Sequence, residues 1–124
     1  MTNGKAIYVR VASENQNGST LEHQIANCKE YVKAKFGCEM PLIYSDYGSG
    51  MEPNKPGLKK MFEDAEQGKF NVLVMRDLTR LSRHGLHVVQ MVKRLVKKFG
   101  VKIMLTEDKS VITSRPRKKL QLKK

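Results

Sequence analysis

The sequence has few of the features that mark several common classes of protein. It contains two cysteines, no tryptophan and only 6% aromatic residues. Cys28 and Cys38 show neither CxxC nor metal-ligand spacing, so we interpret both as neutral thiols and not as a disulfide. No apolar run approaches the ~18 residues of a membrane span, and the N-terminus lacks the apolar core of a signal peptide. We therefore expect a cytoplasmic protein without a membrane segment.

Acidic residues are also scarce, with 12 Asp and Glu against 24 Lys and Arg and a net charge of +12. The last ten residues contain no acid and six cations, namely Arg115, Arg117, Lys118, Lys119, Lys123 and Lys124. The rest of the chain is moderately basic, with 18 cations against 12 acids. A basic excess of this size favours a polyanionic partner, because neutralised phosphates release their condensed counterions. The alternative is a basic surface that serves only solubility.

Neither GxGxxG nor GxxxxGK[ST] occurs, which argues against a flavodoxin-like nucleotide binder. His84 and His87 stand three apart on a predicted helix, but they have no HExxH frame and no nearby cysteine. We interpret them as exposed helix residues. The sequence therefore predicts no metal site and no cofactor.

Short apolar segments alternate with amphipathic ones along the chain. The β-branched and apolar runs predict four strands, at Lys5–Val11, Pro41–Tyr44, Asn71–Met75 and Val101–Leu105. Helical spacing predicts helices between them. The first begins after Ser19 and ends near Gly37, the second runs from Pro56 to Gly68, and the third ends at Gly100. One side of the third helix should be lined by Leu86, Val89, Val92, Val96 and Phe99.

Strands alternating with helices favour an α/β fold with three α/β/α layers and a mainly parallel, doubly wound sheet. The pattern dissolves from Thr106 onward. We expect one domain over residues 1–108. Residues 109–124 should form a basic tail that is disordered or is the remnant of a linker to further domains.

Ligands of such sheets bind at the carboxyl ends of the strands. In this chain the loops at those ends cover residues 10–16, 46–55 and 76–83, and they are rich in arginine. Several guanidinium groups converging on one point suit a phosphate, because the planar fork matches its oxygens. Arg10 lies inside an apolar strand, where an unpaired arginine is rare, so function explains it better than structure does. Arg80 and Arg83, taken alone, could equally form a solvated helix face.

Five segments together resemble the motifs of the serine site-specific recombinases, the resolvase and invertase family. Residues 8–16 (YVRVASENQ) are similar to the YxRVSxxxQ opening, and residues 21–24 (LEHQ) to the SLExQ segment that follows it. Residues 44–50 (YSDYGSG) resemble the DxxSG loop, residues 55–58 (KPGL) resemble RPGL, and residues 78–83 (LTRLSR) resemble LDRLSR. The order and spacing of the motifs fit the family from about residue 6 to residue 108.

The resemblance implies a resolvase-like fold and a metal-free reaction on double-stranded DNA. A serine hydroxyl attacks a phosphodiester and leaves a 5'-phosphoserine bond and a free 3'-hydroxyl. Four protomers cut, exchange and religate the strands, so the full-length protein is expected to form dimers or tetramers.

The resemblance also implies roles for individual residues. Arg10, Arg80 and Arg83 would clamp the scissile phosphate, while Gln24 and Asp46 would orient that cluster. Ser49 would contact the phosphate or support its loop. Lys55 stands where the family usually has arginine. Apart from the resemblance, the charge of the tail gives it two interpretations: a DNA-contacting arm or the remainder of a longer protein. Its cations are Arg115, Arg117, Lys118 and Lys119. Thr79 replaces the commoner aspartate and removes an acidic partner from the arginines.

Ala12 occupies the position of the nucleophilic serine. A methyl group cannot attack phosphorus, so the chain as written should not cleave DNA. Successive side chains of a strand point to opposite faces, so Ser13 should point away from the arginines unless the strand bulges. Two explanations stay open: an engineered removal of the serine, or a naturally non-catalytic relative that binds DNA or regulates an active recombinase.

Overall fold

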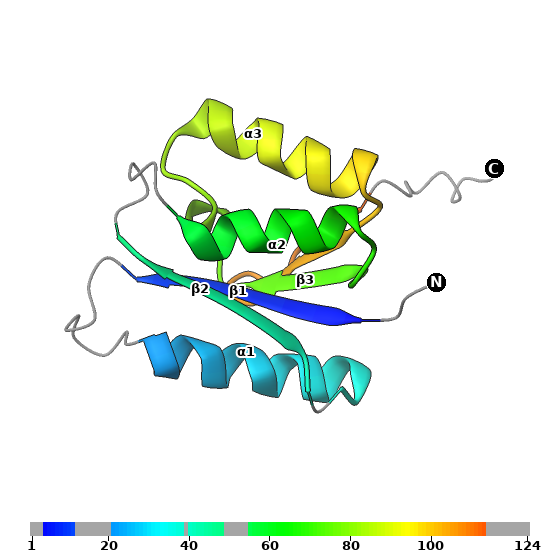
Figure 1. Ribbon diagram of the computed structural model, residues 1–124. Helices are drawn as coiled ribbons and strands as arrows, with labels where there is room; N and C mark the ends of the chain where they lie inside the picture. Colours follow the sequence, from blue (N-terminus) through cyan, green and yellow to red (C-terminus); the bar gives the residue numbers. More distant parts are fainter. Residues whose placement is uncertain (1–3, 12–20, 39, 49–54, 114–124) are drawn as a thin grey trace.

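The computed structural model describes residues 4–11, 21–38, 40–48 and 55–113. In these ranges five strands form one sheet in the order β2-β1-β3-β4-β5 (Figure 1). The first four strands pair in parallel and β5 pairs antiparallel with β4. Their bounds are β1 Lys5–Val11, β2 Leu42–Tyr47, β3 Val72–Met75, β4 Lys102–Leu105 and β5 Val111–Ile112.

Helices cover both faces of this sheet. Helix α1 (Leu21–Phe36) lies on one face, and α2 (Pro56–Glu66) and α3 (Gly85–Lys93) lie on the other (Figure 1). A 3-10 turn, η1 (Leu78–Arg80), follows β3, and a π-helical segment, η2 (Arg94–Lys98), continues α3. The predicted three-layer α/β/α architecture with a mainly parallel sheet is confirmed. None of the helices in the described ranges has the length and apolarity needed to cross a membrane.

Strand β1, which lies between β2 and β3, is buried on both faces, as its apolar run predicts. Ile7 and Val9 point toward α1 and belong to the same core cluster as Cys28 and Val32. Tyr8 points to the opposite face and packs in the larger cluster that α2 and the 3-10 turn complete. The alternation of side chains along β1 therefore places Tyr8 on the face away from α1.

Helix α2 begins where the sequence predicts, and its first turn is fitted closely to β2. Pro56 occupies the first turn, where its missing N–H is no loss. Gly57 follows because a Cβ at this position would lie only 2.2 Å from the backbone oxygen of Ser45. The K-P-G-L segment is thus explained by helix initiation and by close contact with a strand.

The predicted inner face of the third helix is wrong in its first half. Leu86 and Val89 are 65% and 52% exposed, whereas Leu95 and Val96 are buried. The sequence is apolar at 88, 89, 91, 92, 95 and 96, so the apolar residues cover more of the helix surface than the sheet can bury. The spacing of these residues therefore did not show which side of the helix faces the sheet. The helix also does not continue as a regular α-helix, because Phe99 donates to the Arg94 carbonyl across a π-helical turn (2.9 Å).

Two strands extend beyond the predicted pattern. Strand β2 continues through Tyr47, since Asp46 and Tyr47 still pair with β1, although polar residues hide the strand signal there. Strand β5 lies after residue 108, where we expect the tail to begin. It follows a tight turn in which the Asp108 carboxylate accepts hydrogen bonds from the Ser110 amide (3.0 Å) and hydroxyl (2.7 Å). The boundary between domain and tail stays a prediction, and residues 114–124 lie outside the described residues.

Candidate active site

The carboxyl end of β1 brings Arg10 against two other segments of the chain, the end of β2 and η1. The side chain is 1% exposed, and its register partner on β2 is Asp46. Its Nη1 donates to the Gly48 carbonyl (2.7 Å), its Nη2 to the Thr79 carbonyl (2.6 Å) and its Nε to the Arg80 carbonyl (3.0 Å). Three of the five guanidinium N–H groups are therefore bound to the backbone, and one on each Nη is left for other acceptors.

Arg80 returns the contact. Its Nη1 donates to the backbone oxygen of Arg10 (2.8 Å), and its Nη2 lies 3.4 Å from Oδ2 of Asp77. Its Nε is buried and has no hydrogen-bond partner in the described structure. The two arginines thus lock β1 to the 3-10 turn and leave a buried donor at the point where they meet.

The charges at this point repel one another. Burial lowers the pKa of Arg10, and the positive charges of Arg80 and Arg83 lower it further, while Tyr8 and Asp77 oppose them. Arg83 is exposed, so the cluster reaches the surface. The structure therefore joins Arg10 and Arg80 directly, while Arg83 acts on Arg10 through its charge alone. An anion bound among them would relieve their repulsion.

Asp46 binds Tyr8 and the start of α2 through its carboxylate. Oδ1 accepts the Gly57 amide (2.7 Å), and Oδ2 accepts the Leu58 amide (2.8 Å) and the Tyr8 hydroxyl (2.7 Å). Burial raises the pKa of Tyr8 far above its usual value, and the bond to Asp46 raises it further. These contacts show that Asp46 fixes the start of helix α2. The expectation from the sequence was that it would orient the arginine cluster.

Lys55 precedes α2 and reaches toward the arginine cluster. Its Nζ donates to the backbone oxygen of Leu81, 3.3 Å away and one residue beyond η1. Because Lys55 directly precedes the helix that Asp46 caps, the position of α2 also brings this cation close to the end of η1.

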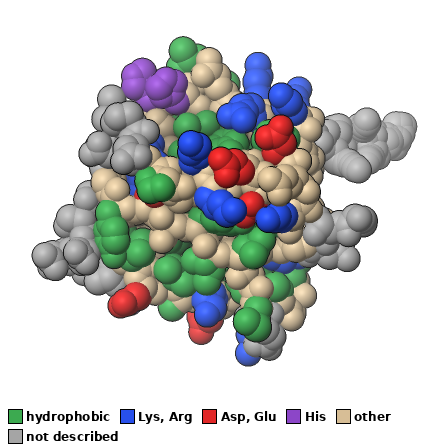
Figure 2. Space-filling model, viewed as in Figure 1, with side chains coloured by type: hydrophobic (Ala, Val, Ile, Leu, Met, Phe, Trp, Pro, Cys, Tyr) green, Lys and Arg blue, Asp and Glu red, His purple; other side chains and the backbone are tan. Residues whose placement is uncertain are grey.

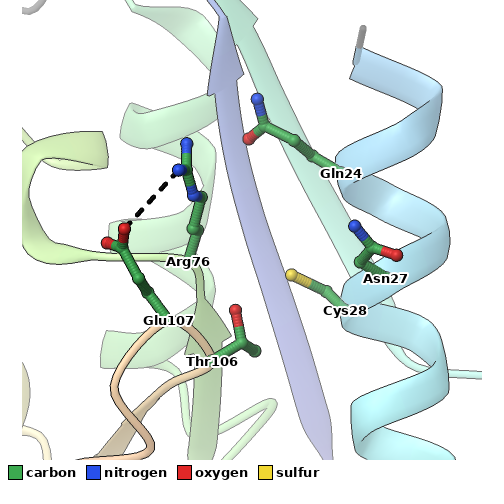
Figure 3. Close-up of a pocket in the computed structure, with 6 residues that line it drawn as sticks. All are labelled: Gln24, Asn27, Cys28, Arg76, Thr106 and Glu107. Carbon is green, nitrogen blue, oxygen red and sulfur yellow. Dashed lines mark ion pairs between the residues drawn. The ribbon is translucent and has the colours of Figure 1, made fainter. Parts of the chain in front are cut away.

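Gln24 lies on the other face of the sheet. It is buried on α1, and its Oε1 has no hydrogen-bond partner in the described structure. It lines a pocket of about 120 Å³ together with five other residues, Asn27, Cys28, Arg76, Thr106 and Glu107 (Figure 3). On the side of the pocket opposite α1, Arg76 and Glu107 form an ion pair at 3.5 Å (Figure 3). The structure does not place Gln24 in the hydrogen-bond network of Arg10.

The cysteines and histidines agree with their predicted environments. Cys28 and Cys38 are free thiols, and burial raises the pKa of Cys28 to about 11. His84 and His87 are exposed, with ring centroids 4.6 Å apart, and Figure 2 shows histidine side chains gathered over the start of α3. No group of three or more His, Cys, Asp or Glu suited to a metal occurs among the described residues.

Several predicted site residues lie outside the described residues. They are Ala12, Ser49 and the tail cations Arg115, Arg117, Lys118 and Lys119. Asp77, by contrast, lies at the site in the structure but was not among the residues predicted from the sequence. The signal was available, because Asp-x-Thr before an apolar residue is typical of a side chain that accepts the amide two residues on.

Comparisons with known proteins agree on one family. The family described as "Resolvase, N terminal domain" matches residues 5–124. A resolvase of Clostridium perfringens is 32% identical over 107 residues, which are 86% of this chain and 51% of that protein. A DNA-invertase of Enterobacteria phage P7 is 33% identical over 109 residues, which are 88% of this chain and 51% of that protein. The chain thus spans about half the length of these relatives.

Solved structures show the same fold. The N-terminal catalytic domain of TP901-1 integrase matches with a TM-score of 0.78 and 27% identity, over 88% of this chain and 82% of that one. The C-terminal catalytic domain of ISC1926 TnpA, an IS607-like serine recombinase, matches with a TM-score of 0.70 and 28% identity, over 98% and 74%. This chain belongs to the serine recombinase family and corresponds to its resolvase-type N-terminal catalytic domain.

Proposed function

We propose that the chain is a DNA-recombination domain that holds a scissile phosphodiester with Arg10, Arg80 and Arg83 and, as written, does not cleave it. The substrate is double-stranded DNA in the cytoplasm, and the full-length protein works as a dimer or tetramer. The observation that carries the proposal is the reciprocal bonding of Arg10 and Arg80, which leaves the buried Nε of Arg80 without a partner at the carboxyl end of the sheet.

The geometry suits charge that develops on a phosphate. Arg10 is held rigidly by three carbonyls, so its remaining N–H groups have fixed directions. Donors that are oriented before the reaction stabilise a transition state without reorganising, and a buried site strengthens each of them. Lys55 adds a further positive charge beside η1. Ser49 is proposed to contact the phosphate or to support its loop, and the tail cations to contact the DNA backbone. Gln24 lies on the other face of the sheet and is not proposed to bind the phosphate.

The missing element is the nucleophile. With serine in place of Ala12, the hydroxyl oxygen would bond to phosphorus, the bond from phosphorus to the 3'-oxygen would break, and the serine proton would leave as the 3'-oxygen gains one. No metal is needed, because the arginines neutralise the charge on the pentavalent phosphorus.

The Ala12→Ser variant tests this proposal. The full chain carrying this change is joined to a sequence-specific DNA-binding domain and given a nicked duplex that contains its site. We expect a covalent adduct whose mass identifies a phosphoserine at position 12. The matched control adds Arg80→Gln, which should reduce the adduct at least ~100-fold because one oriented donor is lost. A folded Ala12→Ser fusion that forms no adduct on bound DNA would contradict the proposal.

A naturally non-catalytic DNA-binding or regulatory module is the second candidate, and Ala12 itself favours it. Lys55 and Thr79 also depart from the motifs, as expected of a chain that no longer cleaves. An alanine codon at position 12 in the genome, with no adduct from the serine variant, would support this candidate. A serine codon would identify Ala12 as an engineered change.

A further inference from the structure

Asp77 lies between the end of β3 and the first residue of η1 and contacts both sides of the turn. Its Oδ1 accepts the Thr79 amide (2.9 Å) and the Thr79 hydroxyl. Its Oδ2 lies 3.4 Å from Nη2 of Arg80 and 3.9 Å from Nε of Arg76. One carboxylate therefore joins the start of the turn to the arginine at its end.

The acid that the LDRLSR motif places before the arginine is absent here. Thr79 stands at that position, and its hydroxyl contacts Asp77 while its backbone oxygen accepts from Arg10. The residues i and i+3 of a helical turn lie on the same side, so Asp77 reaches the Arg80 side chain from two residues earlier than the motif position. The negative charge is thus retained at the site although its sequence position has changed.

We propose that Asp77 is a positioning residue that orients the Arg80 guanidinium toward the phosphate, in place of the acid missing at position 79. This inference rests on the proposed function. Arg80 is held at Nη1 by the Arg10 carbonyl and at Nη2 by Asp77, and these two contacts fix the plane of the guanidinium whose buried Nε has no partner among the described residues. The Thr79 hydroxyl fixes the carboxylate that makes the second contact.

Asp77 carries its charge at neutral pH. Burial alone would raise its pKa, but the hydrogen bonds from Thr79 and the charges of Arg80 and Arg76 outweigh burial and lower it. The contact with Arg80 is therefore between two ionised groups, which makes it stronger and more directional than a neutral one.

A purely structural role must be separated from this one, since Asp77 also caps η1. Asp77→Asn does so, because asparagine caps a helix as well as aspartate and has the same shape, but it carries no charge. Asp108→Asn is the matched control. Asp108 accepts the amide and hydroxyl of Ser110 in the same kind of turn, and its loss changes the net charge equally.

The measurement is the rotation of the Arg80 guanidinium about its Nε–Cζ bond, followed by NMR in the full chain. We expect Asp77→Asn to speed this rotation roughly threefold to tenfold, as loss of a partly exposed charge-assisted contact should. Asp108→Asn should leave it unchanged. The double variant Asp77→Asn with Thr79→Asp should restore slow rotation, because the acid returns to the motif position.

The Thr79→Val variant, at an exposed position, tests the same contact by a second substitution. Removing the hydroxyl that fixes Asp77 should speed the rotation about twofold while the acid remains. The proposal is overturned if neither Asp77→Asn nor Thr79→Val alters Arg80, or if Thr79→Asp fails to restore it.

Addition of a 20-base-pair duplex separates this result from the proposed function. We expect the duplex to shift the Arg80 Nε signal in the parent chain and to shift it at least threefold less in Asp77→Asn, whereas a parent signal that does not respond would count against phosphate binding itself. A shift of equal size in both proteins would show that Asp77 does not direct Arg80 toward the phosphate.

Discussion

Arg10 serves the fold as well as the proposed chemistry. An arginine that only binds a phosphate would have no need for three backbone acceptors, yet its Nε, Nη1 and Nη2 each bind a carbonyl from a different residue. Those carbonyls belong to the β2 end and to η1, the two segments that surround the site. The side chain that would contact the phosphate therefore also builds the site around it.

Arg10→Lys tests this structural role. A lysine keeps the charge but has one donor centre in place of the planar fork, so at least one buried carbonyl loses its partner. We expect the free energy of unfolding to fall by about 2–4 kcal/mol, measured by urea denaturation. Arg83→Lys, at an exposed position, should change it by less than ~0.5 kcal/mol. Equal stability of the two variants would show that the carbonyl contacts of Arg10 contribute nothing.

The sequence singled out Arg10 because it lies inside an apolar strand, and the LDRLSR resemblance added Arg80 and Arg83. It could not reveal what binds them. The acceptors of Arg10 are backbone carbonyls, and a carbonyl has no signature in the amino-acid sequence. Asp77 was missed for a different reason, since the motif directs attention to position 79 and the acid lies two residues earlier.

At the scale of elements, the start of α2 lies in close contact with β2. Gly57 lies against the Ser45 carbonyl, and a Cβ would also approach Oδ1 of Asp46 to 3.0 Å. Both neighbours are fixed, because Ser45 is paired within the sheet and Asp46 caps the helix. Neither can move without disturbing the position of Lys55.

Gly57→Ala should therefore force α2 away from β2. We expect a loss of about 2–3 kcal/mol in the free energy of unfolding, as for overpacking in a rigid core. Gly85→Ala is the matched control, because Gly85 begins α3 and a Cβ there meets nothing within 4 Å. It should be neutral or stabilise by up to ~1 kcal/mol. The clash would be refuted if Gly57→Ala were as stable as the control.

The elements that sequence predicted well are those with one dominant signal. Strands β1, β3 and β4 are apolar runs buried on both faces, and their observed bounds differ from the prediction by at most one residue. Helix α1 ends one residue before Gly37, whose positive φ of 68° stops the helix. Prediction failed where the signal was ambiguous or weak. Helix α3 has apolar residues around too much of its surface to show its inner face, and β5 is too short, at two residues, to give a strand pattern.

For the whole molecule, the arrangement of charge decides how DNA would be bound. The net charge is +12, but half of it comes from the last ten residues. On the face shown in Figure 2, lysine and arginine side chains are interspersed with acids, and Lys60 and Lys69 both lie 3.6 Å from Asp64. Such pairing reduces the attraction of this face for a polyanion.

The tail should therefore supply most of the salt-dependent affinity for DNA. Each phosphate contact that is lost lowers the slope of log K against log[salt] by about 0.9, so removal of residues 115–124, with six cations, should lower it by up to about five. Titration of a labelled duplex between roughly 50 and 200 mM salt measures this slope. A variant with the six tail cations replaced by glutamine keeps the chain length and should behave like the truncation, because the effect is one of charge. If the slope of both variants matched that of the parent, the basic tail would have no part in binding, and the counterions released would have to come from contacts of the other 18 cations of the chain.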